Sequence, residues 1–156
     1  MQPKPPTPPS RPRPCSGCTL CCTLAFDAPD KPAGKPCEHC TGKGCKIYDK
    51  RPTVCRRFVC LWSASSALHG SLRPDLCGAF FEPVRGKPIM MVNVDPARPR
   101  SWEEGIVKSL IDRFVAQGTA VAIVVGKQNH FRLPAGAAFV PVWRDLLEYA
   151  RASGVR

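Results

Sequence analysis

The run Cys15-Ser-Gly-Cys18-Thr-Leu-Cys21-Cys22 opens a cysteine-rich segment that closes with Cys55-Arg-Arg-Phe-Val-Cys60. Nine of the ten cysteines of this 156-residue chain lie between Cys15 and Cys60. Such a density indicates disulfides, a metal site or thiol chemistry. This segment decides the fold of the first half of the chain, because few aliphatic side chains are available there to build a core.

The beginning of the chain favours reduced cysteines over disulfides. Residues 1–14 include seven prolines and lack the apolar stretch, roughly 7–15 residues long, of a signal peptide. No segment approaches the roughly 20 apolar residues that span a bilayer. We therefore expect a cytoplasmic protein, in which thiols stay reduced and clustered cysteines bind metal. Disulfides are the less favoured alternative, since adjacent Cys21 and Cys22 would bond each other only with strain.

The chain is predicted to have an α+β fold in three parts. Residues 1–14 form a disordered proline-rich tail, and residues 15–77 form a cysteine-rich metal-binding lobe of short helices and loops. Residues 78–156 form an α+β part that packs with the lobe as one compact domain. Apolar patterns in this last part predict the order β-β-α-β-β-α, a mostly antiparallel sheet with helices on one face, with strands at 79–84, 89–94, 120–125 and 130–133.

Helices are predicted from capping residues and apolar periodicity. Ser101 and Glu104 form a capping box, which predicts a helix to about Gln117 that Gly118 stops. Gly70 is expected to end a helix that begins at Leu61. Further helices are expected at about 15–26, 52–58 and 142–152.

The cysteine spacing predicts a metal site. Two cysteines separated by two residues supply two metal ligands from one turn, and this spacing recurs at Cys15/Cys18, Cys18/Cys21 and Cys37/Cys40. Cys15, Cys18 and Cys21 match the spacing that holds three corners of a [4Fe–4S] cluster. Paired elements with four sulfur ligands instead fit zinc. Both metals stay open at this point.

The wider pattern resembles a known family. Besides the opening run it includes Pro36-Cys37 and Cys45-x-Ile-Tyr48-x2-Arg51-Pro-x2-Cys55-Arg-x-Phe-x-Cys60. Over about residues 15–60 it is similar to the bacterial CxxCxxCC family, which is described as zinc- or iron-chelating. The resemblance implies an accessory or metal-handling protein, and we predict no catalytic residue. It also implies eight ligand candidates: Cys15, Cys18, Cys21, Cys22, Cys37, Cys45, Cys55 and Cys60. Eight ligands suffice for two four-cysteine sites, or for one cluster with some structural thiols. Flagellin lysine N-methylases have a similar cysteine set, so a protein-modifying enzyme is the alternative.

Some residues of the segment depart from this pattern or have other expected roles. Cys40 stands where the family usually has an apolar residue, and Cys77 lies outside the matched region, so both are spare thiols. His39 could complete a site with three cysteines, but a solvated loop histidine is the favoured interpretation. Tyr48 and Phe58 are expected in a small core of the lobe.

The formal net charge of +11 raises a nucleic-acid-binding protein as a second alternative. The favoured explanation is local, because cations stabilise neighbouring thiolates, and basic residues surround the cysteines at Lys46, Lys50, Arg51, Arg56 and Arg57. The chain also lacks an interleaved aromatic stripe that would stack on bases. We therefore expect the chain to bind a metal ion, and a protein partner is also open. We do not expect it to bind nucleic acid or a membrane.

Overall fold

The computed structural model describes residues 13–14, 17–24 and 34–153. Their fold is α+β, as the sequence predicts. Short helices come first: α1 (Leu20–Leu24), the 3-10 helix η1 (Tyr48–Lys50), α2 (Thr53–Arg57), α3 (Leu61–Ala64), the 3-10 helix η2 (Gly70–Leu72) and α4 (Pro74–Cys77). The strands and longer helices follow: β1 (Ala79–Pro83), β2 (Ile89–Val94), α5 (Gly105–Ala116), β3 (Ala120–Val125), β4 (Gln128–Arg132) and α6 (Phe139–Ser153).

The four strands form one mixed sheet in the order β1-β2-β3-β4. Its outer pairs, β1 with β2 and β3 with β4, are antiparallel, and the central pair is parallel. Parallel neighbours need a long crossover, and α5 provides it between β2 and β3. The predicted element order and the predominance of antiparallel pairing are thus confirmed for residues 79–153.

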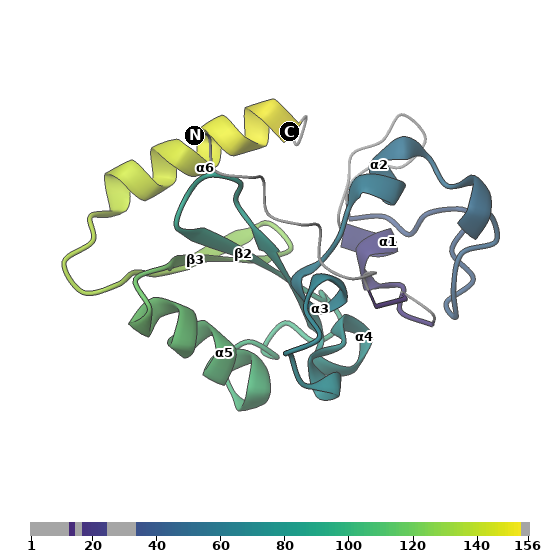
Figure 1. Ribbon diagram of the computed structural model, residues 1–156, viewed down its shortest axis with the longest axis horizontal. Coiled ribbons are helices and arrows are strands. Elements are labelled where there is room, and N and C mark those ends of the chain that lie inside the picture. The colour runs from purple at the N-terminus through teal and green to yellow at the C-terminus, as the bar shows by residue number, and fades with distance from the viewer. Residues whose placement is uncertain (1–12, 15–16, 25–33, 154–156) are drawn as a thin grey trace, which may run out of the picture.

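The expectation that the helices share one face of the sheet is wrong. Figure 1 shows α5 on one side of the sheet and α6 on the other. Met90, Val92 and Val94 of β2 pack in the cluster that contains the buried face of α5, whereas Ile89 packs in the cluster that α6 covers. Strands buried on both faces have nearly continuous apolar sequences, as in IMMV at 89–92 and AVAI at 120–123.

Two predicted helix boundaries are also wrong. The residue before α5 is Glu104, and Ser101 does not cap the helix because its hydroxyl donates to the carbonyl of Gly78, 3.1 Å away. Helix α3 spans four residues and ends at Ala64. Gly70 then begins η2, whose first turn is capped by His69, where the ring accepts a hydrogen bond from the Ser71 amide.

Residues 17–60 of the cysteine-rich lobe pack against the sheet through a small apolar cluster, whereas Leu72 and Cys77 of the lobe join the core on the α5 face. Buried Leu20, Cys60 and Phe80 form the small cluster, and the ring of Phe58 meets that of Phe80 edge-on with centroids 5.4 Å apart. Phe80 of β1 points to the same face of the sheet as the α6 contacts, so this face is shared by the lobe and α6. The lobe stands beside the sheet in Figure 1, in purple and blue.

Segments at the boundary of the lobe are tied to it by hydrogen bonds. Arg13, expected in the tail, donates its amide to the carbonyl of Ser63 at 2.7 Å and its guanidinium to the carbonyl of Leu68 at 2.8 Å. The rest of the predicted tail, residues 1–12, lies outside the described residues. None of the helices in the described ranges is long and apolar enough to cross a membrane.

Candidate metal centre

The predicted ligands are spread over the short elements of the lobe. Cys21 and Cys22 lie on α1, and Cys55 lies on α2. Cys18 lies two residues before α1, and Cys60 directly precedes α3. Cys37 and Cys45 lie in the described segment that precedes η1. Cys15 lies outside the described residues.

One group of thiols faces the sheet. Cys60 is 8% exposed and packs beside Leu20 and Phe80, and Cys21 contacts the same cluster. Cys18 lies close enough to Cys60 for the two thiols to interact electrostatically. The structure therefore brings these three predicted ligands to one side of the lobe.

Cys18 occupies a polar niche at the start of α4. Burial raises the pKa of its thiol to about 11, while the backbone N–H groups of Leu20 and Asp75 point at the sulfur and oppose the rise. The thiol is therefore protonated at neutral pH. A metal ion that binds Cys18 must displace this proton, and the two N–H donors are then already in place for the thiolate.

Asp75 and Arg73 complete this niche. The guanidinium of Arg73 donates two hydrogen bonds of 2.6 Å to the carboxylate of Asp75. Burial alone would raise the pKa of Asp75, but these bonds outweigh it and the pKa is lowered. The sequence did not reveal this pair as part of the site, because its contact with Cys18 joins residues more than fifty positions apart.

A second group of thiols lies on the turn at residues 37–45. The Cys37 amide donates to the carbonyl of Cys22 at 3.1 Å, and the Cys40 amide donates to the carbonyl of Cys37 at 2.9 Å. Cys40 and Cys45 then pair in an isolated antiparallel bridge. The backbone thus links the second half of α1 to this turn.

The two groups of thiols do not form a complete metal site among the described residues. Within residues 13–14, 17–24 and 34–153, no three His, Cys, Asp or Glu side chains converge as metal ligands. The donor chemistry nevertheless fits, because a set made almost wholly of thiols is the type that zinc and iron–sulfur clusters take.

The spare thiols have different surroundings. Cys77 packs against the core that covers the α5 face of the sheet, and its thiol donates to the carbonyl of Ala79 at 3.1 Å. Burial raises the pKa of Cys77, as expected of a structural thiol. Cys40, by contrast, faces the predicted ligand Cys45.

The other residues singled out in the lobe mostly face solvent. His39 lies 3.3 Å from the carboxylate of Glu38, measured between Nε2 and Oε1. The prediction that Tyr48 is a core residue is wrong, since its side chain is 42% exposed and stacks under the guanidinium of Arg51, 3.6 Å from the ring centre. Phe58 does belong to the small core.

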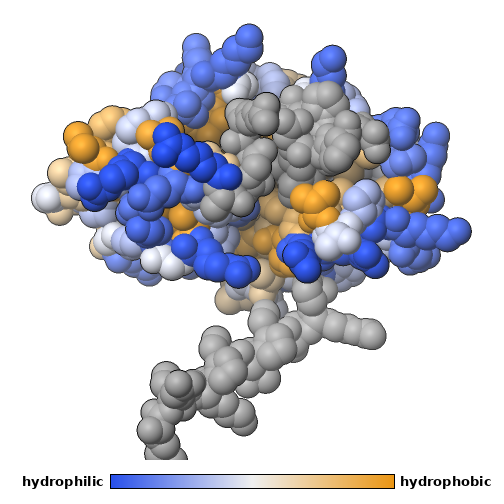
Figure 2. All heavy atoms as spheres, turned by 90° about the horizontal axis from the view of Figure 1, so that it is seen from above, coloured by the Kyte–Doolittle hydropathy of each residue, from blue (hydrophilic) through white to orange (hydrophobic). Residues whose placement is uncertain are grey.

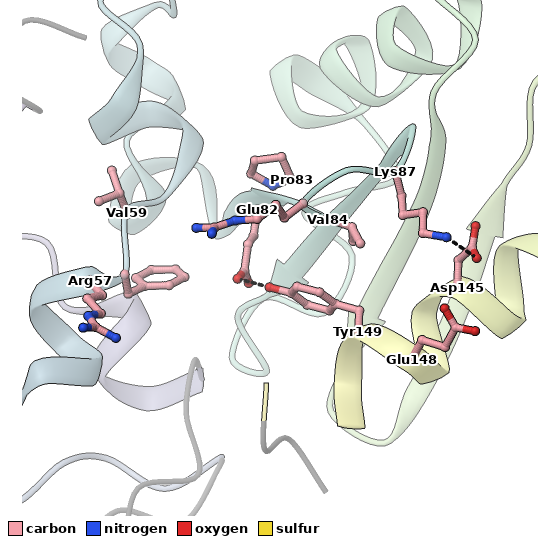
Figure 3. Close-up of a pocket in the computed structure, with 11 residues that line it drawn as sticks. Arg57, Val59, Glu82, Pro83, Val84, Lys87, Asp145, Glu148 and Tyr149 are labelled. Carbon is pink, nitrogen blue, oxygen red and sulfur yellow. Dashed lines mark hydrogen bonds and ion pairs between the residues drawn. The ribbon is translucent and has the colours of Figure 1, made fainter. Parts of the chain in front are cut away.

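A groove of about 870 Å³ lies beside the lobe, between it, the β1–β2 hairpin and α6. Figure 3 shows the Glu82 carboxylate and the Tyr149 hydroxyl pointing toward each other, with Val59 of the lobe across the cavity. The hydroxyl donates a 2.5 Å hydrogen bond to Glu82. Burial raises the pKa of Glu82, and this hydrogen bond opposes the rise. No sequence motif marks this groove, which is assembled from three distant segments.

Hydrophilic side chains project from much of the face shown in Figure 2, with small hydrophobic groups between them. On α6 the exposed hydrophobic residues are Phe139, Val140, Trp143 and Leu147. Comparisons of the chain with models of protein families, with curated proteins and with solved structures gave no match.

Proposed function

We propose that this chain is a metal-binding protein of the zinc- or iron-chelating CxxCxxCC type. Its cysteine-rich lobe would hold zinc or an iron–sulfur cluster through clustered thiolates. The role that fits best is that of an accessory or metal-handling protein.

The observation that supports this proposal most is the small apolar core of the lobe. Among the described residues before Leu72, the buried ones are Leu20, Cys60 and Ser63. Helices of four or five residues are not stable without further contacts. Metal–thiolate bonds can provide those contacts, because metal binding to such a lobe contributes directly to its folding.

The ligands would come from both groups of thiols. Cys18, Cys21 and Cys60 lie on the side of the sheet, and Cys22, Cys37 and Cys45 are linked through the turn, with Cys15 and Cys55 completing the predicted set. Zinc would supply tetrahedral cross-links, and an iron–sulfur cluster would add electron transfer. The N–H groups that point at Cys18 would stabilise its thiolate.

Metal content tests the proposal directly. The full chain is purified without oxygen and analysed for zinc and iron, and its visible absorption is recorded. We expect metal in the wild type and in Cys77→Ser, whose thiol serves the sheet core, and less metal in Cys60→Ser. A folded, colourless and metal-free wild type would contradict the proposal.

The groove supports a second candidate, a protein-modifying enzyme similar to flagellin lysine N-methylases. It offers a partly buried carboxyl group between apolar and charged side chains beside the cysteine-rich lobe. Titration of S-adenosylmethionine into metal-replete protein tests this candidate by calorimetry. Saturable binding would support it, and a titration without binding heat would count against it.

A further inference from the structure

Cys40 and Cys45 face each other across a short antiparallel bridge. The flanking hydrogen bonds run from the Thr41 amide to the Gly44 carbonyl and from the Lys46 amide to the His39 carbonyl, both at 2.9 Å. Because the bonds come from the neighbours and not from the cysteines, this is a non-hydrogen-bonded pair. In such pairs the Cα atoms are about 4.5 Å apart and the side chains are at their closest.

This geometry suits a disulfide. The Cα separation of such a pair falls within the range of about 4.4–6.8 Å that disulfides require. Both thiols are free and half-buried. A small oxidant can therefore reach them, and they can be joined without a large movement of the backbone.

The turn between the two cysteines is held in this conformation. Gly42 and Gly44 have φ angles of +76° and +158°, which disfavour residues with a side chain. The Thr41 hydroxyl donates to the Gly44 carbonyl at 3.2 Å and accepts from the Lys43 amide at 3.3 Å. The pair is thus pre-organised by its own loop.

We propose that Cys40 and Cys45 form a reversible disulfide when the protein meets a hydroperoxide. The thiolate of one cysteine attacks the peroxide, the O–O bond breaks, and a sulfenic acid forms as hydroxide leaves. The second thiolate attacks the sulfenic sulfur, the S–S bond forms, and a second hydroxide leaves. With the two thiol protons, one hydrogen peroxide yields one disulfide and two waters, and a dithiol reductant reverses the change.

The disulfide would also act on the metal site, a consequence that rests on the proposed function. Cys45 is a predicted ligand, and a sulfur bonded to Cys40 can no longer bind metal as a thiolate. Oxidation of this pair would therefore release metal. Cys40, which departs from the family pattern, would then be the residue that makes the lobe sensitive to peroxide.

Peptide mapping of the full chain tests the disulfide without reference to metal. The protein is treated with hydrogen peroxide, alkylated, and cleaved after Glu38, Lys43 and Lys46. This leaves peptides 39–43 and 44–46, which only a bond between Cys40 and Cys45 can hold together. We expect the joined species, and its separation by dithiothreitol. Two separate alkylated peptides, or a bond from Cys40 to Cys37 in the peptide that ends at Glu38, would overturn the proposal.

Two matched variants sharpen the test. Cys37→Ser should keep the joined species, because Cys37 is not in the bridge, and Cys40→Ser should abolish it. Metal release on peroxide treatment should be several-fold slower in Cys40→Ser than in the wild type. Equal release would overturn the link to the metal site. A wild type that holds no metal but forms the disulfide would contradict the proposed function and leave the disulfide supported.

Discussion

Hydrogen bonds of single residues connect elements that are distant in the sequence. The Tyr149 hydroxyl connects α6 to Glu82 on β1, and the Asp75 amide at the start of α4 points at the sulfur of Cys18, which precedes α1. In both places a titratable group is partly withdrawn from water, and burial raises its pKa. Substitutions at such positions are expected to have effects that depend on pH.

Tyr149→Phe removes the donor from the Glu82 carboxyl group. Glu82 is partly buried, and loss of a typical hydrogen bond costs about 0.5–1.5 kcal/mol. The bond lowers the pKa of Glu82, so it favours the charged form, and the cost should be larger at neutral pH than at pH values where Glu82 is protonated. Urea unfolding of wild type and variant at several pH values measures this difference.

Glu82→Gln is the control for this prediction, because it keeps an acceptor but cannot ionise. Burial raises the pKa of Glu82, so the folded state holds this proton more tightly than the unfolded state does. The wild type should therefore lose stability relative to Glu82→Gln as pH rises above the ordinary glutamate range. A cost of Tyr149→Phe that is the same at every pH would contradict this account.

Gly78 marks a position where the backbone requires glycine. It ends α4 with φ +80°, and an added Cβ would lie 3.0 Å from the Ser101 hydroxyl. Gly78→Ala should destabilise the protein by about 1–3 kcal/mol. Gly126 also has positive φ, +58°, but open space around it, so Gly126→Ala should cost about 1 kcal/mol. Equal costs by denaturant unfolding would show that the contact with Ser101 is unimportant.

At the scale of elements, α6 packs on the face of the sheet opposite α5. Val142, Leu146 and Tyr149 pack on the cluster around Ile89, and Lys87 pairs with Asp145 at 2.8 Å. Since the pair is near the surface, it contributes little, and the apolar contacts hold the helix.

Neighbouring leucines of α6 offer a matched test of this packing. Leu146 contacts the sheet cluster, whereas Leu147 is 38% exposed. Leu146→Ala should cost about 1–3 kcal/mol, and Leu147→Ala should change the stability by no more than about 0.5 kcal/mol. The reverse order in thermal unfolding would mean that α6 docks through its other face.

The sequence predicts most helices and strands of the second half of the chain, but not how they pair and pack. Two strands, Ile89–Val94 and Ala120–Val125, have the predicted bounds. The parallel pairing between them and the placement of α6 opposite α5 depend on contacts between distant segments. Ser101 shows the same limit locally, because its hydroxyl bonds Gly78 instead of capping α5.

The whole molecule consists of two unequal parts. The sheet has a large buried core on the α5 face, to which Leu72 of the lobe also belongs, while residues 17–60 of the lobe share one small cluster with β1. The two parts should therefore respond differently to loss of metal.

Removal of metal by a chelator should unfold the lobe and leave the sheet folded. Hydrogen exchange should then become fast in the described lobe segment 34–60 and stay slow at 89–94 and 120–125. If residues 34–60 were equally protected from hydrogen exchange before and after chelation, in protein shown to have lost its metal, a stabilising role for the metal would be contradicted.

The candidate site was predictable as a set of residue types, but not as an arrangement. The density of thiols between Cys15 and Cys60 indicates disulfides, metal or thiol chemistry, and their spacing predicts metal ligands. The contact of Cys18 with Asp75 and the pairing of Cys40 with Cys45 depend on the folded backbone. For that reason Cys40 stood as a spare thiol by sequence and faces Cys45 in the structure.

Native mass spectrometry of the full chain, purified without oxygen, tests the central claim most directly. It weighs the folded chain together with whatever it binds. We predict a mass above that of the polypeptide by one or more zinc ions or by an iron–sulfur cluster, and the bare polypeptide mass after acid treatment. A folded chain at the bare polypeptide mass, before any acid or oxidant is added, would contradict the claim that the cysteine-rich lobe binds metal.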